Sequence, residues 1–268
     1  ASAACALGAV TLIAGGPGTG KTTTVARMVA LLNEVWPTTP RVALAAPTGK
    51  AAARLQEALA AEHTRLTTAG LPAPGEIAAS TLHRLLGWRP GSRTRFKHDR
   101  TNRLPFDLVV VDETSMVSLT LMSRLLDAIR PDAALVLVGD PDQLASVEAG
   151  SVLGDLVHRP PRPGPDARYA ALAQLLPGDA VPAAEIDAGL RNDVVRLQTV
   201  HRFGGAIAEL AEAVRLGRAD DVIELLTTRG NSVEFIDNTD MERQHAAGLD
   251  ALHEDVLTSG RRLYEAAV

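Results

Sequence analysis

The sequence predicts an α/β fold built on a doubly wound parallel sheet with flanking helices. Short apolar runs rich in valine alternate with helical patterns through the first 157 residues. Two of the runs, 107–111 and 134–138, lack polar alternation, as is typical of strands that are buried on both faces. Because strands and helices alternate, we expect parallel strands with helices packed over the sheet.

Each element of this fold follows from a local pattern. The expected strands are the apolar runs Val10–Ala14, Arg41–Ala46, Asp107–Val111, Ala134–Val138 and Val194–Thr199. Helices are expected where apolar residues recur at helical spacing, which is the case after residue 21 and at Ala51–Leu59, Val117–Ile129, Ala206–Leu216 and Asp221–Leu226. Ligands of such sheets bind beyond the carboxyl ends of the strands, so motifs that follow strands are the candidate sites.

Composition restricts the class of protein. No run of 18 apolar residues exists, and the apolar opening lacks a basic segment, so we expect neither a membrane span nor a signal peptide. The lone Cys5 suits a reducing cytoplasm. A net charge of −5 places any contact with nucleic acid in a local groove. Only three of the 27 basic residues are lysines, and Lys21 and Lys50 follow glycines, which hints at a need for a compact ammonium or at chance.

The first motif is a phosphate-binding loop between a strand and a helix. Residues 15–22 read GGPGTGKT and match G-x-x-x-x-G-K-[ST]. The expected nucleotide-binding residues are Gly15, Gly16, Pro17, Gly18, Thr19, Gly20, Lys21, Thr22 and Thr23. Backbone N–H groups and the helix N-terminus would hold the phosphates, Lys21 would reach the β- and γ-phosphates, and Thr22 would ligate Mg²⁺. The alternative is a glycine-rich turn with an incidental lysine.

Two adjacent acids follow the buried strand that ends at Val111. Asp112 would hold Mg²⁺ through its water shell, and Glu113 would orient and deprotonate the attacking water. The alternative is an acidic helix N-terminus capped by Thr114 or Ser115. That alternative does not explain why an apolar strand delivers the pair.

Three further segments narrow the class of ATPase. Residues 46–52 read APTGKAA, residues 139–144 read GDPDQL and residues 199–203 read TVHRF. Together with GGPGTGKTTT and VVVDETSM, they resemble superfamily 1 DNA helicases, most of all the RecD-type alpha subunit of exodeoxyribonuclease V, the RecBCD helicase–nuclease. The resemblance covers about residues 9–216, and STLHRLLG at 80–87 and NRLP at 102–105 also fit it.

The resemblance implies a P-loop, RecA-like motor domain that uses ATP and Mg²⁺. It implies that Gln143 contacts the γ-phosphate and that Arg202 neutralises transition-state charge, although Gln143 is also a possible helix cap and Arg202 a possible surface residue. The implied contacts to single-stranded DNA are Pro47, Thr48, Gly49, Lys50, Ser80, Thr81 and His83. A second anion site beside the phosphate-binding loop would couple DNA to ATP. His83 could equally be a buried, hydrogen-bonded histidine.

The segment Trp88–Arg103 is densely basic, and Trp88 and Phe96 could stack on bases. A solvated, mobile hairpin is the plainer interpretation. With only eight aromatic residues in the chain, most of the grip on DNA would come from backbone contacts.

The function implied by the resemblance is an ATP-dependent, 5′→3′ DNA helicase subunit in double-strand-break repair and recombination. Its implied partners are single-stranded or duplex-end DNA and the beta and gamma subunits of a helicase–nuclease. We expect residues 1–200 to form the motor domain and 201–268 the helical start of an incomplete second domain, so that the chain is a fragment. The alternatives are a stand-alone RecD-like or relaxase-associated helicase and a nucleotide-gated assembly subunit without motor activity.

Overall fold

The chain divides into two compact units, Ala1–Arg202 and Phe203–Val268, which are described separately. The computed structural model describes residues 9–73, 77–89, 95–143, 152–159, 193–197, 199, 201, 204–228, 233, 253–254, 256–262 and 264–265. No helix within these ranges is both long and apolar enough to span a bilayer.

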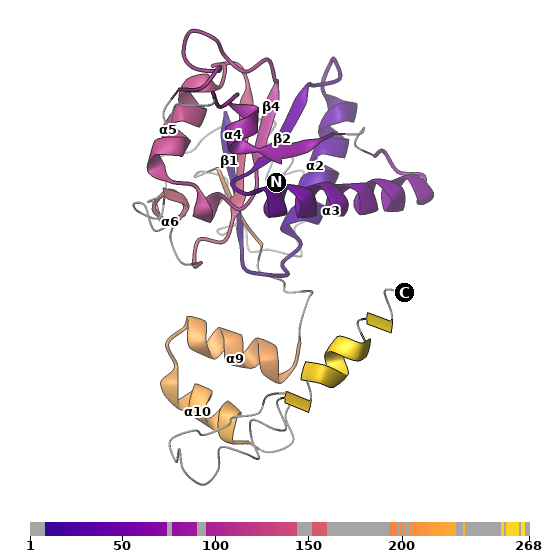
Figure 1. Ribbon diagram of the computed structural model, residues 1–268, viewed down its shortest axis with the longest axis vertical. Helices are drawn as coiled ribbons and strands as arrows, with labels where there is room; N and C mark the ends of the chain where they lie inside the picture. Colours follow the sequence, from indigo (N-terminus) through magenta and orange to yellow (C-terminus); the bar gives the residue numbers. More distant parts are fainter. Residues whose placement is uncertain are drawn as a thin grey trace, which may run out of the picture. The chain divides into compact units, whose positions relative to one another are not determined.

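A six-stranded sheet with every neighbouring pair parallel forms the centre of the first unit, in the order β3-β2-β4-β5-β1-β6 (Figure 1). The strands are β1 (Val10–Gly15), β2 (Val42–Ala46), β3 (Ala79–Thr81), β4 (Leu108–Val111), β5 (Ala134–Gly139) and β6 (Val194–Leu197). The predicted α/β fold with a parallel sheet is confirmed. The crossovers in this order place β5 between the strand that precedes the glycine-rich loop and the strand that precedes the paired acids.

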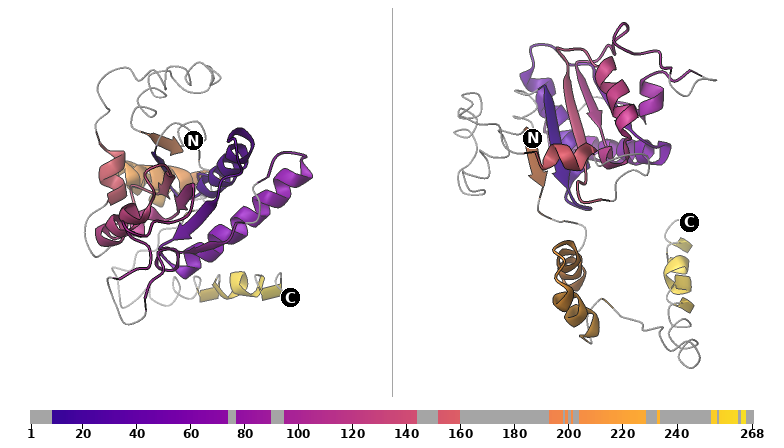
Figure 2. Two further views of the ribbon diagram at one scale, coloured as in Figure 1. Left: turned by 90° about the horizontal axis from the view of Figure 1, so that it is seen from above. Right: turned by 90° about the vertical axis from the view of Figure 1, so that its left-hand side faces the viewer.

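Helices cover both faces of the sheet, as the two further views show (Figure 2). They are α2 (Lys21–Val35), α3 (Gly49–Thr68), α4 (Leu82–Leu85), the 3₁₀ turn η1 (Thr114–Met116), α5 (Leu119–Ala128) and α6 (Val152–Val157). Leu108 and Val110 of β4 pack with α2 and α3 on one face. Val109 and Val111 pack with α4 and α5 on the other. The unbroken apolar run in β4 therefore contributes side chains to the cores on both faces of the sheet, as a doubly wound sheet requires.

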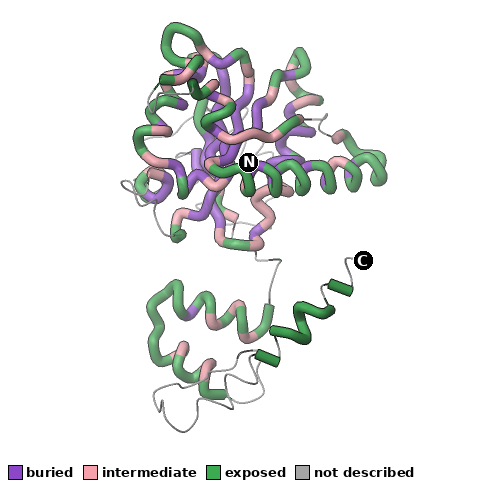
Figure 3. Tube along the Cα trace, viewed as in Figure 1, coloured by how far each residue is buried: buried purple, intermediate pink, exposed green. Residues whose placement is uncertain are grey.

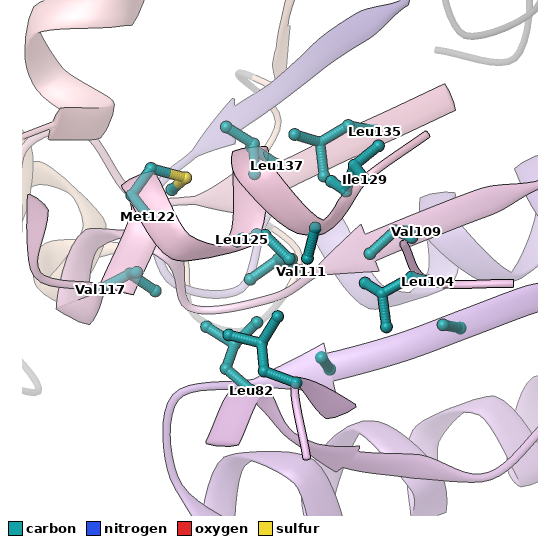
Figure 4. Close-up of a cluster of buried hydrophobic side chains, with 14 of the residues drawn as sticks. Leu82, Leu104, Val109, Val111, Val117, Met122, Leu125, Ile129, Leu135 and Leu137 are labelled. Carbon is teal, nitrogen blue, oxygen red and sulfur yellow. The ribbon is translucent and has the colours of Figure 1, made fainter. Parts of the chain in front are cut away.

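The second of these cores is closed by α5, whose Leu125 points toward β4 (Figure 4). Leu125 and Val111 are both fully buried. Burial of a side chain of this size stabilises the fold by about 1.5–3 kcal/mol. The core lies directly behind the carboxyl end of β4 and fixes the position at which the paired acids leave the strand.

Helix α3 is longer than its sequence pattern predicts, running to Thr68 rather than to Leu59. Its buried stripe continues through Glu62 and Leu66, and the carboxylate of Glu62 interrupts the apolar periodicity. Arg27 of α2 compensates that buried charge through a bond from its Nε to Glu62 Oε1 at 2.8 Å. A partner on another helix cannot be inferred from local spacing, so the predicted helix ended too early.

Two other predicted boundaries differ from the structure. The helix expected at Val117–Ile129 begins at Leu119, because the Ser118 hydroxyl accepts a bond from Leu121 N and caps α5. Strand β3 and the short α4 were not predicted, since β3 has only three residues and is defined by its pairing with β2.

An aspartate at the amino edge of the sheet ties three strands together. Asp107 precedes β4 and accepts bonds from the Arg41 backbone N–H, at 2.8 Å, and from Arg130 Nη2, at 2.6 Å. Arg41 precedes β2 and Arg130 lies before β5. The Asp107 pKa is lowered from 3.8 to about 2, mainly by the bond from the Arg41 N–H. The guanidinium groups of Arg130 and Arg41 lower it further, and partial burial acts in the opposite direction.

The second unit is described mainly through two helices, α9 (Ala206–Arg215) and α10 (Ala219–Thr227). Gly217, with φ of 67°, provides the left-handed residue of the short turn between them. Of the described residues in this unit only Ala213 is buried, and the helices are largely exposed in Figure 3. The helical pattern predicted for this part of the chain is present at both sites.

Candidate functional site

Three of the predicted motifs lie at the carboxyl ends of three adjacent strands. The glycine-rich loop follows β1, the GDPDQL segment follows β5, and Asp112 and Glu113 follow β4. Hydrogen bonding in register joins β1 to β5 and β5 to β4. The topology thus brings side chains from distant parts of the sequence to one stretch of sheet edge, which we call the nucleotide end.

The loop after β1 has a backbone that only glycine accommodates readily. Gly18 and Gly20 have φ of 76° and 81°, in the left-handed region. A Cβ on Gly15 would lie 2.6 Å from Thr19 Oγ1 and 3.0 Å from Leu197 O, so this position leaves no room for a side chain. The loop then leads into α2, whose N-terminus presents unpaired N–H groups. Such a cradle fits an anion the size of a phosphate.

Lys21 is held across this loop. Its Nζ donates to Gly15 O at 2.7 Å and to Gly16 O at 2.9 Å. Thr19 is buried and donates from Oγ1 to Gly16 O at 2.9 Å, so a second side chain fixes the same turn. The ammonium is therefore placed inside the curve of the loop, where a phosphate would be bound.

Asp112 lies at the tip of β4 with 9% of its surface exposed. Burial of the carboxyl group is the main cause of a raised Asp112 pKa, and the negative charge of Glu113 raises the pKa further. Two smaller effects oppose this rise: the Glu113 N–H donates to Asp112 Oδ1 at 2.9 Å, and the Lys21 ammonium attracts the carboxylate. Lys21 and Asp112 are therefore close enough to interact electrostatically, although their strands are not neighbours. A desolvated carboxylate is a group that a bound cation would stabilise.

Glu113 has an unusual backbone, with φ of 52° and ψ of 41°. For a residue that is neither glycine nor asparagine, this left-handed conformation costs on the order of 1–3 kcal/mol and occurs where the surroundings impose it. Thr114 Oγ1 imposes it in part by donating to Val111 O at 3.0 Å. The side chain of Glu113 is half-buried, in contrast to that of Asp112.

The predicted alternative role of Thr114 and Ser115 as helix caps is wrong. Thr114 and Ser115 do not cap the following helix, because Ser118 does so and η1 intervenes. Gln143 Oε1 accepts a bond from Ser115 Oγ at 2.8 Å, and the residues that follow Gln143, where a helix capped by it would begin, lie outside the described ranges. This contact across 28 residues of sequence joins the end of β5 to the turn after β4.

The segment after β6 also reaches the glycine-rich loop. The backbone N–H of His201 donates to Gly18 O at 2.8 Å. The predicted Arg202 lies outside the described residues, so its side chain is not placed. Nothing in the local sequence pattern indicated the His201 contact, because it is made by a backbone group.

The predicted DNA-contact residues lie together at the carboxyl ends of β2 and β3, which pair with Ala46 opposite Thr81. Thr48 caps α3 by accepting from Ala51 N, and Thr81 caps α4 by accepting from Arg84 N. Pro47 and Ser80 are half-buried. The other members of the set, Gly49 and Lys50 in the first turn of α3 and His83 in α4, are exposed. We call this stretch the DNA end.

Two expectations about this region need correction. The DNA end is not beside the phosphate-binding loop, because β4 and β5 separate β2 from β1. Three strand spacings of about 4.8 Å place the two strands roughly 14 Å apart. His83 is exposed rather than buried, and its ring lies 5.9 Å from that of Phe96.

The first part of the basic segment Trp88–Arg103 contains an antiparallel pair. Trp88 and Phe96 form an isolated bridge, and Arg89 N donates to Arg95 O at 3.3 Å. Residues 90–94, between them, lie outside the described ranges. Trp88 is about half exposed, at 48%.

The donor set at the nucleotide end suits Mg²⁺ with a nucleotide. It offers one buried carboxylate from Asp112 and a hydroxyl from Thr22, and the described residues contain no cluster of three or more His, Cys, Asp or Glu side chains that could form a protein cage for a metal. Magnesium is commonly held by one or two such groups together with phosphate oxygens and water. The residues therefore fit an ion that arrives with a triphosphate.

Comparisons with known proteins agree with the motifs. A family model described as an AAA domain matches residues 1–149. The chain is 47% identical over 263 residues to the RecBCD enzyme subunit RecD of Mycolicibacterium smegmatis, covering 97% of this chain and 41% of that protein. It is 51% identical over 235 residues to the same subunit of Mycobacterium tuberculosis, covering 86% and 36%. The predicted resemblance to RecD-type proteins is confirmed.

Other similarities are shorter or more distant. The ATP-dependent RecD2 DNA helicase of Deinococcus radiodurans is 40% identical over 153 residues, which is 56% of this chain and 18% of that protein. A crystal structure of Bacteroides Pif1 bound to single-stranded DNA aligns with a TM-score of 0.42 and 20% identity, over 88% of this chain and 52% of the other. The chain spans about two fifths of the length of the RecD relatives that it matches.

Proposed function

The chain belongs to the AAA-domain family, and from that premise we propose that it binds and hydrolyses ATP to drive a protein along single-stranded DNA. The proposed protein is a 5′→3′ helicase subunit of a RecBCD-type helicase–nuclease that acts in the cytoplasm on duplex ends during double-strand-break repair and recombination. The observation that carries the proposal is the convergence of the glycine-rich loop, the paired acids and Gln143 on β1, β4 and β5.

The proposed chemistry divides among the residues of the nucleotide end. The backbone N–H groups of residues 15–23 and the Lys21 ammonium would bind the phosphates, and Thr22 and Asp112 would hold Mg²⁺. When bound, Mg²⁺ supplies positive charge that neutralises the phosphate oxygens. Glu113 would accept a proton from the attacking water, and its half-buried position leaves it accessible to that water.

Gln143 and Arg202 would complete the site. An amide can bond a phosphate oxygen without taking up or releasing a proton, which suits Gln143 as the γ-phosphate contact. The bond from His201 N to Gly18 O brings the backbone next to Arg202 against the phosphate-binding loop, which supports a role for that arginine in neutralising transition-state charge. We propose that residues 1–200 form the first motor domain and that 201–268 are the helical start of a second.

The DNA end supports coupling to a single strand. Exposed Lys50 follows the capped turn at Thr48, so an ammonium and free N–H groups at a helix N-terminus face solvent together. Contacts of this type bind phosphates and carry little sequence information. The strands β4 and β5 connect β1 to β2 within one hydrogen-bonded sheet. We propose that a movement of the phosphate-binding loop is transmitted to the DNA end through these strands.

Membership of a helicase–nuclease complex is favoured over a stand-alone RecD-like or relaxase-associated helicase. The similarity to RecBCD subunits extends over 97% and 86% of the chain, against 56% for the RecD2 helicase. We therefore propose beta and gamma subunits as partners. The remaining alternative, a nucleotide-gated assembly subunit, leaves the hydrolytic roles proposed for Glu113 and Gln143 without a use.

The test is ATP hydrolysis by the complete protein, alone and with its proposed partner subunits, in the presence and absence of oligo-dT. Single-stranded DNA is expected to stimulate turnover, since the two ends of the sheet edge are proposed to be coupled. Binding of ATP without stimulation by DNA would favour the assembly subunit instead. An absence of nucleotide binding would overturn both.

A further inference from the structure

A bond between the side chains of Ser115 and Gln143 joins two of the nucleotide-end motifs directly. Ser115 Oγ donates to Gln143 Oε1 at 2.8 Å, a normal length for such a bond. Ser115 is 5% exposed, whereas Gln143 is exposed. A donor fixed in the interior thus holds a flexible side chain that otherwise lies in solvent.

This contact determines which end of the Gln143 amide is free. An amide has an acceptor oxygen and a donor NH₂ group, and only the NH₂ group can bond a phosphate oxygen. Because Ser115 occupies the oxygen, the Nε2 group is the end that remains available. Without Ser115, both rotations of the amide and several side-chain rotamers become accessible, and ordering such a side chain again costs free energy.

The position of Ser115 is itself fixed by its surroundings. Ser115 lies in η1, where Met116 N donates to Glu113 O and Val117 N to Thr114 O, both at 3.0 Å. A Cβ on Gly139 would lie 3.3 Å from Ser115 N and 2.6 Å from Leu153 Cδ2. The close approach of β5 to η1 therefore depends on a glycine, and it brings the donor within reach of Gln143.

We propose that Ser115 is a positioning residue that holds the Gln143 amide with its NH₂ group free for the γ-phosphate. The inference rests on the proposed function, which assigns Gln143 its phosphate. Ser115 lies two residues after Glu113 in one hydrogen-bonded turn. The bond from Ser115 to Gln143 therefore links the turn that carries the proposed general base to the proposed phosphate contact.

A double-mutant cycle in the complete protein tests this assignment. Ser115→Ala is expected to lower the kcat of DNA-stimulated ATP hydrolysis about two- to tenfold, the scale of one net hydrogen bond. Gln143→Ala is expected to lower it further. In the double variant the loss should equal that of Gln143→Ala alone, because Ser115 acts only through Gln143.

Ser118→Ala is the matched control, since it also removes a serine hydroxyl from this region. Ser118 caps α5 and has no bond to Gln143, so its loss should lower the thermal unfolding midpoint and leave kcat unchanged. If Ser115→Ala does not fold, Ser115→Thr and Ser115→Val form a pair of equal size that differs in the hydroxyl. Threonine should then retain a two- to tenfold higher kcat than valine.

The outcomes separate this inference from the proposed function. Wild-type protein without DNA-stimulated hydrolysis would overturn the function. If the wild type is active, three results would overturn the role of Ser115 alone. They are an unchanged kcat in Ser115→Ala, losses that multiply in the double variant, and equal kcat for Ser115→Thr and Ser115→Val.

Discussion

The two ends of the same sheet edge differ in how their functional groups are held. At the nucleotide end, Asp112 and Thr19 are buried, Lys21 is bonded to two carbonyls, and Glu113 has a left-handed backbone. At the DNA end, Thr48 and Thr81 only cap their helices, and Lys50 is exposed. The groups of the nucleotide end are held by bonds and burial within the protein, whereas the DNA end presents its groups to solvent.

The difference follows from what each end is proposed to do. Hydrolysis requires charges that are already oriented in a site of low dielectric, because reorienting them during the reaction raises the barrier. A strand that moves must be released repeatedly, so exposed contacts to phosphates are sufficient. The comparison predicts that substitutions at the nucleotide end reduce the rate strongly, and those at the DNA end reduce affinity in a salt-dependent way.

The largest expected effect is that of Glu113→Gln. Loss of a general base is expected to lower ATP turnover by roughly 10²–10⁴-fold. Binding of ATP should persist, because Lys21, Thr22 and the loop are unchanged, and a nucleotide titration beside the steady-state rate measures both.

Glu57→Gln is the control for this variant, because Glu57 is an exposed glutamate on α3 far in sequence from the loop. It should leave turnover within about twofold, as surface substitutions usually do. Near-normal turnover in Glu113→Gln would end the assignment of Glu113 as the base.

A smaller effect is expected from Lys50→Ala at the DNA end. Loss of one phosphate contact should weaken binding of oligo-dT by up to about tenfold at low salt and reduce the slope of log K against log salt by about one. Fluorescence anisotropy at several salt concentrations measures both quantities. Turnover at saturating DNA should be retained, because Lys50 is proposed to take no part in hydrolysis.

Arg65→Ala supplies the matched control, since Arg65 is a basic residue near the other end of α3 and is exposed. Its removal should leave the salt slope unchanged. If Arg65→Ala and Lys50→Ala weaken the binding of oligo-dT equally, the effect is one of total charge. Lys50 would then not be a specific DNA contact.

The smallest effect on activity is expected at the amino edge, where Asp107 joins β2, β4 and β5 without any proposed part in catalysis. Its pKa is lowered in the folded state from 3.8 to about 2, so below pH 4 the unfolded chain binds the proton more readily. The stabilisation is therefore complete above about pH 4 and is lost as the pH falls toward 2.

Asp107→Asn should lower the free energy of unfolding by about 1–2 kcal/mol at pH 7, since the side chain is partly exposed, and leave kcat unchanged. Urea denaturation from pH 7 to pH 3 measures it, and the difference between wild type and variant should narrow toward the acid end. A constant difference would show that the carboxylate charge is not the cause.

The sequence by itself determined the parallel α/β class, five of the six strands and the order of the motifs along the chain. Valine-rich runs such as 108–111 must be buried on both faces, and a run like GGPGTGKT can only turn where glycine allows positive φ. These features depend on local sterics and on hydrophobic burial, which are encoded by neighbours in the chain. The paired acids were predictable for the same reason, because the strand delivers them.

Tertiary structure alone decided how the motifs face one another. The order β4-β5-β1 places the GDPDQL strand between the other two motifs, and the separation of β2 from β1 moves the DNA end away from the loop. The bonds from Ser115 to Gln143, from His201 to Gly18 and from Arg27 to Glu62 join residues 28 or more apart in the chain, or a backbone group that has no sequence signature. Such contacts depend on which strands pair and how closely they approach, and this is settled only when the whole sheet packs.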